Sequence, residues 1–512
     1  MAPGSSFLAF GIAVSAVALI YLFPRRRQSV VESYPPGPKS PNIPTLDAWV
    51  QYQDWGESMV HLVYIRENNM LILNNAHVAI DLLDKRARIY SDRAMTNMMK
   101  LCGFDDILST QRYSDKWRGN RRLFQQNFRK SVSSRFYPVQ YKEIHQFLHN
   151  LADVPEEFMQ HTMSVSQGLI YASLYGLDIR SDGRLAQKAE ETANVIGQAI
   201  VEPFPAIERF PWLHFMPSWF PGCGFQKVVQ KCIAGVKEAD TIPFDNAVNN
   251  LKMGTGTSLV AELALENPED IEKIKAMGTV SFLAASDTTM SSIASFLLTM
   301  TQHPEVQSKA QAEIDHVIGR DRLPTFDDRQ SLPYVESIYR EIMRMHPPVP
   351  TSMRYLIQEI EYFLRFCRSP HVSTEDDFYR GYYLPKGCQV VANIWGINRD
   401  PNMFPEPDKF MPERFLNSPT GPYTNINNIY AFGFGRRFCA GRHMADNTVW
   451  LTIVSVLATL DLRNAKDDTD NEIDIPGEYT KTFFRHPLPY RSSITPRDQQ
   501  ARDLILATTT VD

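Results

Sequence analysis

Cysteine is scarce in this sequence, with 6 among 512 residues, and no two stand in C-x-x-C or another metal-binding spacing. This scatter argues against a disulfide framework and predicts free thiols in a reducing compartment. The six are Cys102, Cys223, Cys232, Cys367, Cys388 and Cys439.

An excess of charge and low-complexity linkers are also missing. The net charge is −5 with 22% charged residues, so nothing indicates a nucleic-acid partner. Because no linker-like stretch divides the chain, we expect one large folded domain over residues 49–500, followed by a tail over residues 501–512.

One cysteine has a special context. Cys439 lies in the segment Phe432–Gly441, which reads FGFGRRFCAG. Its three glycines, Gly433 among them, permit a tight turn and a close approach to a flat ligand. Arg436 and Arg437 place positive charge beside the thiol, which favours the thiolate. The segment therefore presents a cysteine to a metal, and the alternative is a structural cysteine buried in a glycine-rich turn.

This segment matches the Phe-x-x-Gly-x-Arg-x-Cys-x-Gly haem loop of the cytochromes P450, and the resemblance extends over nearly all of residues 1–500. It implies a mainly α fold with small β-sheets and a bound haem b. It also implies that Cys439 is the axial thiolate ligand of the iron. By the same resemblance Arg437 holds a haem propionate, and Phe432 and Gly433 belong to the cofactor-binding loop.

A second motif is Trp117-x-x-x-Arg121. Residues four apart share one face of a helix, so this ring and this guanidinium can contact the same anion. In the family that this chain resembles, the motif binds a haem propionate. The alternative is a surface stack of Trp on Arg.

A long apolar helix is expected from Ile274 to Thr301, and it contains the sequence AASDTT. An acid beside a hydroxyl on a buried helix can relay protons. The motif resembles the family's oxygen-activation motif, which implies that Thr288 hydrogen-bonds dioxygen and that Asp287 delivers protons. Ala285 stands where the family usually has glycine. The alternative role for Thr288 is a hydrogen bond back to a helix carbonyl.

Glu341 and Arg344 stand three apart in a predicted helix, where a carboxylate can hold a guanidinium. Any such pair can be an exposed ion pair. Here the phrase HPPVP follows it, and PERF, with Arg414, comes some seventy residues later. Glu341, Arg344 and Arg414 thus resemble the structural triad of the family, which fixes the fold around the haem loop.

The N-terminal region is apolar and then basic. Residues 7–23 are uncharged and about long enough to span a bilayer, and three arginines follow. We therefore expect a membrane anchor over residues 1–27 with the folded domain in the cytosol. A cleaved signal peptide is the alternative, although the charge lies on the wrong side for one. A proline-rich hinge over residues 28–48, without helix or ladder hydrogen bonds, follows.

Residues 210–222 (FPWLHFMPSWFPG) are rich in proline and in aromatic residues, which is unusual for a loop. We interpret this segment as a lid that contacts the membrane and admits lipophilic substrates. The alternative is a loop packed on the domain's own core.

The resemblance predicts a haem-thiolate monooxygenase that inserts one oxygen atom of O₂ into a small lipophilic substrate. The phrases HPPVP, PERF and FFRHPLP are similar to those of fungal microsomal members in secondary metabolism, such as the O-methylsterigmatocystin oxidoreductase-like and tryptamine hydroxylase-like groups. Terpenoid, polyketide and aromatic amine substrates all remain open. Because the chain lacks a G-x-G-x-x-G motif and a flavin domain, electrons must come from NADPH–cytochrome P450 reductase, which implies the endoplasmic reticulum membrane.

One stretch does not fit the family pattern. Residues 354–369 (RYLIQEIEYFLRFCRS) stand where relatives run directly onward to Pro370. Codons for Arg354, Tyr355 and Ser369 can supply the GT and AG of an intron that leaves the frame intact. The stretch is therefore a retained intron or a lineage-specific insertion. If it is present in the protein, the alternative function is a membrane-attached haem-binding protein that is impaired or inactive.

Overall fold

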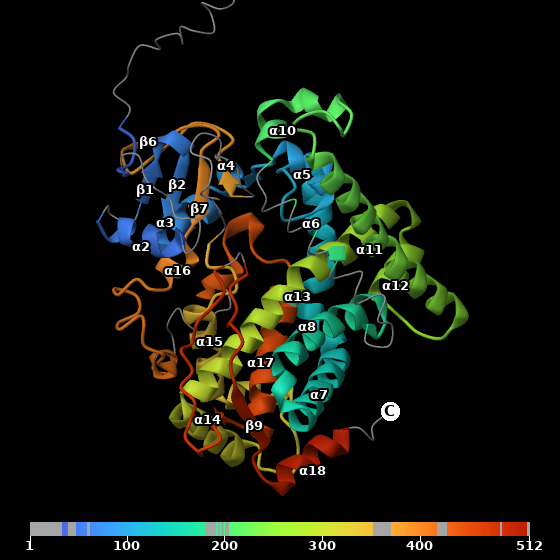
Figure 1. The fold of residues 1–512 in the computed structure, drawn as a ribbon, viewed down its shortest axis with the longest axis vertical. Helices are drawn as coiled ribbons and strands as arrows, with labels where there is room; N and C mark the ends of the chain where they lie inside the picture. The colour runs from blue at the N-terminus through green and yellow to red at the C-terminus, as the bar shows by residue number, and fades with distance from the viewer. Residues whose placement is uncertain are drawn as a thin grey trace, which may run out of the picture.

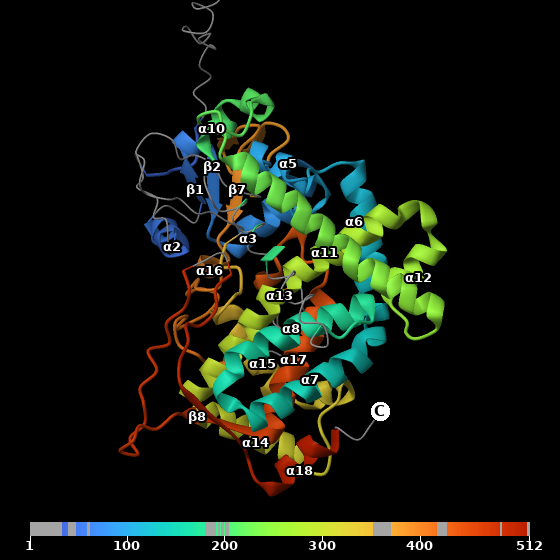
Figure 2. The ribbon, with the colours of Figure 1, turned by 45° about the vertical axis from the view of Figure 1, so that its right-hand side comes forward.

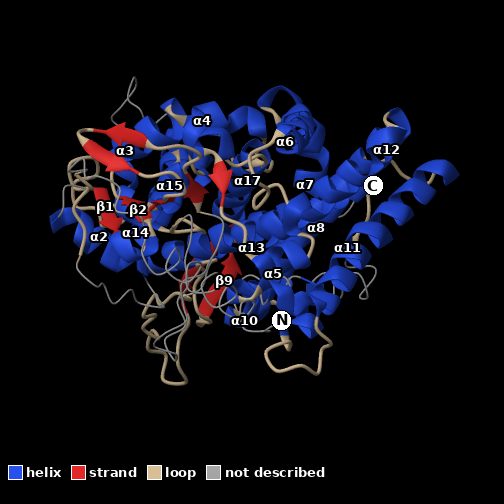
Figure 3. Ribbon diagram, turned by 90° about the horizontal axis from the view of Figure 1, so that it is seen from above, coloured by secondary structure: helices blue, strands red, loops and turns tan. Residues whose placement is uncertain are grey.

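The computed structural model describes residues 33–38, 48–58, 62–179, 191–192, 195, 199, 204–351, 370–416, 428–481 and 484–508. These residues are mainly helical, with three small sheets, as the sequence predicts (Figure 1). The sheet-rich lobe lies at one side, and the long helix α11 and the short helix α12 lie at the other (Figure 3).

The α-helices of the described ranges are α2 (Ala48–Ser58), α3 (Ala76–Ala79), α4 (Ala87–Tyr90), α5 (Asn97–Leu101), α6 (Asp115–Phe128), α7 (Tyr137–Asp153), α8 (Phe158–Tyr175), α10 (Pro205–Arg209), α11 (Phe225–Met253), α12 (Leu259–Glu266), α13 (Ile271–Gln302), α14 (Pro304–Val317), α15 (Pro333–Met345), α16 (Ile394–Ile397), α17 (Arg442–Thr459) and α18 (Gln499–Ala507). Shorter turns used below are the π-helical η2 (Ile80–Lys85) and the 3₁₀ turns η7 (Pro211–Phe215), η10 (Pro412–Phe415) and η14 (Gly435–Arg437). The strands are β1 (Leu62–Ile65), β2 (Met70–Leu73), β3 (Asp92–Arg93), β4 (His371–Val372), β5 (Asp377–Tyr379), β6 (Tyr382–Leu384), β7 (Gln389–Ala392), β8 (Leu460–Asn464) and β9 (Ser492–Pro496).

Helix α13 is the central element of the fold. It has 32 residues and packs against α8, α11, α15 and α17 (Figure 1). Acidic Glu272 in its first turn complements the positive end of the helix dipole. Pro304 directly follows the C-cap His303 and cannot continue the helix. The apolar residues of α13, α15 and α17 form the main hydrophobic core.

The five-stranded sheet has the order β1-β2-β7-β4-β3. β1 and β2 form an antiparallel hairpin, with Asn69 in the left-handed conformation at the turn, and β2 pairs in parallel with β7. The strands β1 and β2 are buried along their whole length, which fits their continuous runs of apolar residues. This sheet supports η2, against which the turn before Cys439 packs.

Two details of chain organisation go beyond the expectations. The described part of the proline-rich hinge, residues 33–38, has no helix or strand, but it still accepts a backbone hydrogen bond, since the N–H of Tyr64 donates to the carbonyl of Pro36 at 2.8 Å. The boundary at residue 500 does not separate a tail, because α18 buries Ala501 and Ile505 against the domain.

Two further expectations fall outside the described residues, namely the anchor over residues 1–27 and the stretch 354–369. Among the helices that the structure describes, none is both long enough and apolar enough to cross a membrane.

Candidate functional site

The loop that carries Cys439 is held against the small lobe by a contact that requires glycine. Gly435 has a φ of 59°, and a Cβ atom there would lie 2.0 Å from the carbonyl oxygen of Leu83 in η2. The backbone N–H of Cys439 donates to the carbonyl of Phe432 at 2.9 Å, which closes the loop. Cys439 thereby stands just before the first turn of α17.

Burial controls the ionisation of Cys439. It raises the pKa of the thiol, and the backbone N–H of Gly441 and the guanidinium groups of Arg121 and Arg442 act in the opposite direction. The sequence had suggested Arg436 and Arg437 for this role, and that interpretation is wrong. Arg436 pairs with the hydroxyl of Tyr113, and Arg437 donates its hydrogen bonds to main-chain carbonyls, so neither guanidinium acts on the pKa of the thiol.

A cavity of about 230 Å³ lies between this loop and the middle of α13. Cys439 and Gly441 line one wall, and Ala284, Ala285 and Thr288 of α13 line the opposite wall. Apolar side chains close the remaining sides, and they come from α6, α8 and α13: Phe124, Phe128, Leu169, Ile170 and Val280. Cys439 therefore lies across the cavity from the small residues and the Thr288 hydroxyl of the AASDTT motif.

Three arginines meet at the edge of this cavity, together with Trp117, and of these Arg121 is buried while Arg93 and Arg437 are half-buried. Arg437 lies under the Trp117 ring, with Cζ 4.3 Å from the ring centroid, and donates to the carbonyls of Ser91, Leu108 and Gln111. Burial and the nearby Arg93 lower the pKa of Arg437 to about 8. Burial likewise lowers the pKa of Arg93 to about 10.

This crowding of positive charge fits an anionic ligand. A guanidinium remains protonated in proteins, so buried arginines this close repel one another unless an anion lies among them. Arg121 is also buried, and its Nε has no hydrogen-bond partner among the described residues. Together with an apolar cavity and one thiol, these donors suit a flat molecule that carries carboxylates at one edge and a metal at its centre. Haem has this form.

The two polar residues of the α13 motif lie on different sides of the cavity wall. The Thr288 hydroxyl faces the cavity and donates to the carbonyl of Ala284 at 2.7 Å. This is the back-bonded alternative, and it leaves the oxygen lone pairs of Thr288 available to accept a hydrogen bond. Burial raises the pKa of Asp287, and His486 from the C-terminal segment opposes that effect.

The structure brings the predicted triad together as a network around the buried Glu341. Arg344 holds Glu341 through two hydrogen bonds, Nε to Oε2 at 2.7 Å and Nη2 to Oε1 at 2.9 Å. Arg414 of η10 donates from Nε to Glu341 Oε1 at 3.0 Å. The network joins α15 to the segment that leads towards the haem loop, and none of its members reaches the cavity.

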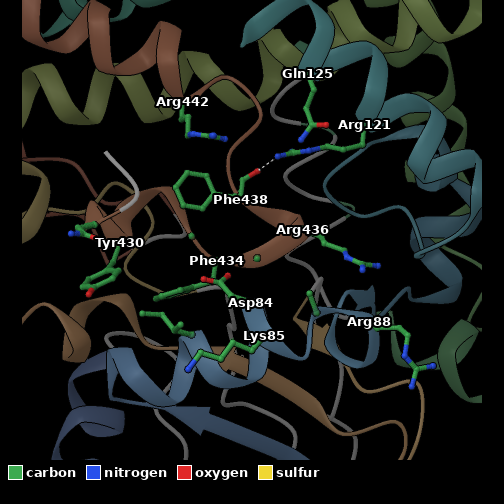
Figure 4. Close-up of a pocket in the computed structure, with 15 residues that line it drawn as sticks. Asp84, Lys85, Arg88, Arg121, Gln125, Tyr430, Phe434, Arg436, Phe438 and Arg442 are labelled. Atoms are coloured by element: carbon green, nitrogen blue, oxygen red, sulfur yellow. Dashed lines mark hydrogen bonds between the residues drawn. The ribbon is translucent and has the colours of Figure 1, made fainter. Parts of the chain in front are cut away.

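The other side of the loop faces a surface pocket of about 570 Å³ (Figure 4). Most of its charged lining is basic. Figure 4 shows Arg121 donating to the carbonyl of Phe438, with Arg442 and Arg436 at the same loop. The remaining cations of the pocket are Lys85 and Arg88.

Sequence reasoning missed Arg93 and Arg442 as members of the site. Arg93 lies in β3 at the edge of the sheet, and Arg442 opens α17 directly after the loop. Arg442 could have been predicted from the sequence, because it stands three residues after Cys439. Arg93 could be found only by knowing that β3 pairs with β4 beside the cavity.

Comparison with known proteins identifies the family. A sequence model described as Cytochrome P450 matches residues 50–365 and 362–493. Cytochrome P450 monooxygenase COX1 of Coprinopsis cinerea is 33% identical over 509 residues, which cover 94% of this chain and 95% of that protein. Cytochrome P450 monooxygenase claR of Ampulloclitocybe clavipes is 32% identical, covering 92% of this chain and 88% of its own.

The fold agrees with these sequences. A solved zebra fish cytochrome P450, determined with progesterone, superposes with a TM-score of 0.68 over 88% of this chain and 100% of its own, at 20% identity. The family of the relatives and the shared fold are consistent with a site made of one cysteine, an apolar cavity and several arginines. The chain therefore belongs to the cytochrome P450 family, and it is a monooxygenase whose cofactor is haem bound through a cysteine thiolate.

Proposed function

We propose that this protein inserts one oxygen atom of O₂ into a small lipophilic molecule in fungal secondary metabolism, with electrons from NADPH–cytochrome P450 reductase. The observation that carries the proposal is the cavity between Cys439 and Thr288, whose other walls are apolar. Such a cavity selects for apolar molecules, and a terpenoid, a polyketide or an aromatic amine would each suit it.

Each residue around the cavity has its own proposed role. Cys439 would hold the iron, and Trp117, Arg121, Arg437 and Arg93 would bind the propionates. Bound in this way, haem supplies the oxidising power that cleaves the O–O bond and attacks an unactivated C–H bond. Thr288 would orient a proton at the cavity wall, while Asp287 would supply it.

The reductase is proposed to dock on the basic side of the haem loop. The lining of the pocket in Figure 4 supports this, because its cations suit an acidic partner. These cations are Lys85, Arg88, Arg436 and Arg442. The exposed Arg118 and Arg122 extend the same positive charge along α6. Together they define a surface on the opposite side of the loop from the substrate cavity.

Attachment to the endoplasmic reticulum membrane is proposed from two apolar features. The first is the apolar run over residues 7–23. The second is the segment from Phe210 to Phe220, where Trp212 is 48% exposed, Phe215 76% and Trp219 79%. Its Leu213 is buried, so the segment is anchored to the domain while its aromatic rings face outward. The segment lies beside α10 at one end of α11 (Figure 2).

Two experiments test the proposal. Expression with a reductase, feeding of candidate metabolites and measurement of product masses should reveal a product heavier by one oxygen atom; NADPH consumption without any product would favour the impaired haem-binding protein instead. Deletion of residues 1–27 should release the protein from membranes only in part, and complete solubility without detergent would contradict a membrane contact by the Phe210–Phe220 segment.

A further inference from the structure

Helix α17, which follows the haem loop, is held near both of its ends by an arginine that binds a carboxylate with two hydrogen bonds. Near the start of the helix, Arg329 donates from Nη1 and Nη2 to the two carboxylate oxygens of Asp446, at 2.7 and 3.1 Å. Near its end, Arg497 donates to Asp315 of α14 at 2.9 and 2.6 Å, and to the carbonyl of Ala458 at 3.2 Å. Two pairs of the same chemistry therefore hold the two ends of one helix.

The pair at the start of α17 also contacts α15. Arg329 comes from the 3₁₀ turn Phe326–Ser331, directly before α15, and its Nε donates to Glu336 Oε2 of α15 at 3.0 Å. Its guanidinium lies 5.2 Å from the ring centroid of the buried Trp450 of α17. Burial lowers the pKa of Arg329, but the carboxylates of Asp446 and Glu336 raise it above its usual range, so the guanidinium remains charged.

Helix α15 is thus attached to the chain on both sides of the haem loop, and it lies beside α17 (Figure 2). Its Glu341 accepts a hydrogen bond from Arg414, which precedes the loop. Its Glu336 accepts one from Arg329, which holds Asp446 after the loop. Five residues of one α-helix separate the two glutamates, so their spacing is fixed by the helix itself. The haem loop therefore lies between two attachments to one rigid element.

A short and rigid path connects Asp446 to the cysteine. Asp446 directly follows Ala445, which lines the cavity together with Cys439. The backbone N–H of Ala445 donates to the carbonyl of Gly441 at 3.0 Å, and the N–H of Cys439 donates to the carbonyl of Phe432 at 2.9 Å. A shift of Asp446 along the helix would therefore be transmitted to the loop that carries the thiol.

Hydrogen bonds between neutral groups support the same part of α17 from another helix. Gln140 of α7 is fully buried, and its Nε2 donates to the carbonyl of Met444 at 3.1 Å and to Thr448 Oγ1 at 2.8 Å. These bonds do not involve α15. They keep the start of the helix folded when the charge pair is altered, so a change at Asp446 acts on the position of the helix relative to α15.

We propose that Arg329, acting through Asp446, is a positioning residue for the haem thiolate: the pair fixes α17 against α15 and so holds the sulfur of Cys439 in the place where it binds the iron. Neither Arg329 nor Asp446 lines the cavity, and both act through the helix. The proposal rests on the role of Cys439 as the iron ligand. It assigns to the downstream side of the loop an attachment that complements the Glu341 network on the upstream side.

The first test measures the loop itself and needs no turnover. Hydrogen exchange at the backbone N–H of Cys439 is followed by mass spectrometry of peptides from the full-length haem protein, in the wild type, in Asp446→Asn and in the matched control Asp315→Asn. Asparagine keeps the shape of aspartate, and Arg329 remains paired with Glu336, so Asp446→Asn should fold. We expect exchange in the loop to become about tenfold faster in Asp446→Asn and to stay at the wild-type rate in Asp315→Asn. Wild-type exchange in Asp446→Asn, or equal acceleration in both variants, would overturn the proposal.

The second test separates positioning from general stability. The reduced carbon monoxide complex is prepared from the same proteins and from Arg329→Lys, and the loss of its thiolate-type spectrum is timed below the unfolding temperature of each. Lysine keeps the charge but cannot bind both carboxylate oxygens side by side. Arg329→Lys and Asp446→Asn should therefore lose the thiolate-type spectrum roughly tenfold faster than the wild type, and Asp315→Asn should match the wild type.

A rate of spectral loss that simply follows the unfolding temperature across all the variants would overturn the proposal, because Arg329 would then serve stability alone. If the wild type itself had no thiolate-type spectrum, the assignment of Cys439 as the iron ligand would fail. The hydrogen exchange result would still decide whether the pair of Arg329 and Asp446 fixes the loop.

Discussion

Arg121 on α6 donates a hydrogen bond from Nη2 to the carbonyl oxygen of Phe438 at 2.6 Å, one residue before Cys439. The same guanidinium lines the substrate-side cavity and lowers the pKa of the Cys439 thiol against the effect of burial. One arginine therefore connects the anion-binding edge of the cavity to the loop that presents the thiol. Haem binding and the geometry of the cysteine are coupled through it.

Arg437→Met should weaken haem binding much more than it weakens the fold. The substitution removes three hydrogen bonds to main-chain carbonyls, but it also removes a charge that burial and the neighbouring Arg93 oppose, so the two effects on the apoprotein partly offset each other. We expect haem affinity to fall roughly tenfold or more, while the unfolding temperature of the apoprotein falls only slightly. Haem titration and thermal unfolding of the apoprotein measure the two effects. A large drop in apoprotein stability would show that Arg437 is structural.

Glu341→Gln should destabilise the fold of the apoprotein. The change leaves Arg344 and Arg414 buried with a neutral partner, and breaking a buried ion pair in this way costs about 3–5 kcal/mol. Urea unfolding should detect this loss in the apoprotein itself. Lys309→Met, which removes an exposed ion pair with Glu413, is the matched control and should leave the stability nearly unchanged. Equal effects of the two substitutions would contradict the structural role of the triad.

Cys439→His should give a haem protein without the thiolate-type spectrum of the reduced carbon monoxide complex. Cys439 is the cysteine that the structure places at the cavity, and Cys102, Cys223, Cys232 and Cys388 are buried elsewhere in the described residues. Cys388→Ser is the control and should keep the thiolate spectrum. Survival of that spectrum in Cys439→His would mean that another residue binds the iron.

The long elements of the fold were predictable because their patterns are long. The sequence predicted a helix from Ile274 to Thr301, and the structure has one from Ile271 to Gln302. The short α3 could not be separated from η2 by periodicity, because a π-helical turn continues the same apolar face with one additional residue. The hydrogen bond from Tyr64 to Pro36 could not be predicted either, since it depends on which strand edge the proline-rich segment reaches.

The candidate site was predictable in its residue types and less so in its side-chain directions. The motif residues Trp117, Thr288 and Cys439 do line one cavity. A turn with three glycines, however, can direct adjacent arginines to either side, so proximity in sequence to Cys439 wrongly selected Arg436 and Arg437 for the thiol. Which arginines face the thiol depends on how α6 and α17 pack, and a local pattern carries no information about that packing.

Thr288→Ala should uncouple NADPH consumption from product formation. The hydroxyl lies on the cavity wall opposite Cys439, and without it a proton can no longer be oriented there. We expect peroxide released per NADPH to rise by about an order of magnitude while haem content stays normal. Thr289→Ala is the neighbouring control on the same helix turn. An unchanged product yield in Thr288→Ala would contradict its proposed role.

Residues 354–369 are the stretch that we predict to interrupt the family pattern, and the family match divides at the same place. The family model matches the chain in two pieces, and the first ends at residue 365 while the second begins at residue 362, within this stretch. The flanking residues have fixed places in the fold. Trp395 donates to the carbonyl of Pro350 at 2.9 Å, and Ala94 donates to the carbonyl of Pro370 at 3.5 Å.

Both flanks lie close to the site. Ala94 directly follows Arg93, and Trp395 contacts Arg485 of the C-terminal segment. A displacement of Pro350 or Pro370 would therefore be transmitted to the arginines at the cavity edge and to the C-terminal segment, and a misplacement of roughly 1 Å at an active site can reduce the rate by about two orders of magnitude. We predict that a chain without Tyr355–Arg368 binds haem more tightly and turns over faster than the chain with it. Haem titration and product formation by the two chains measure this, and sequencing of the transcript across the site decides between a retained intron and an insertion. Equal haem affinity and equal turnover would show that the fold accommodates the additional residues without cost.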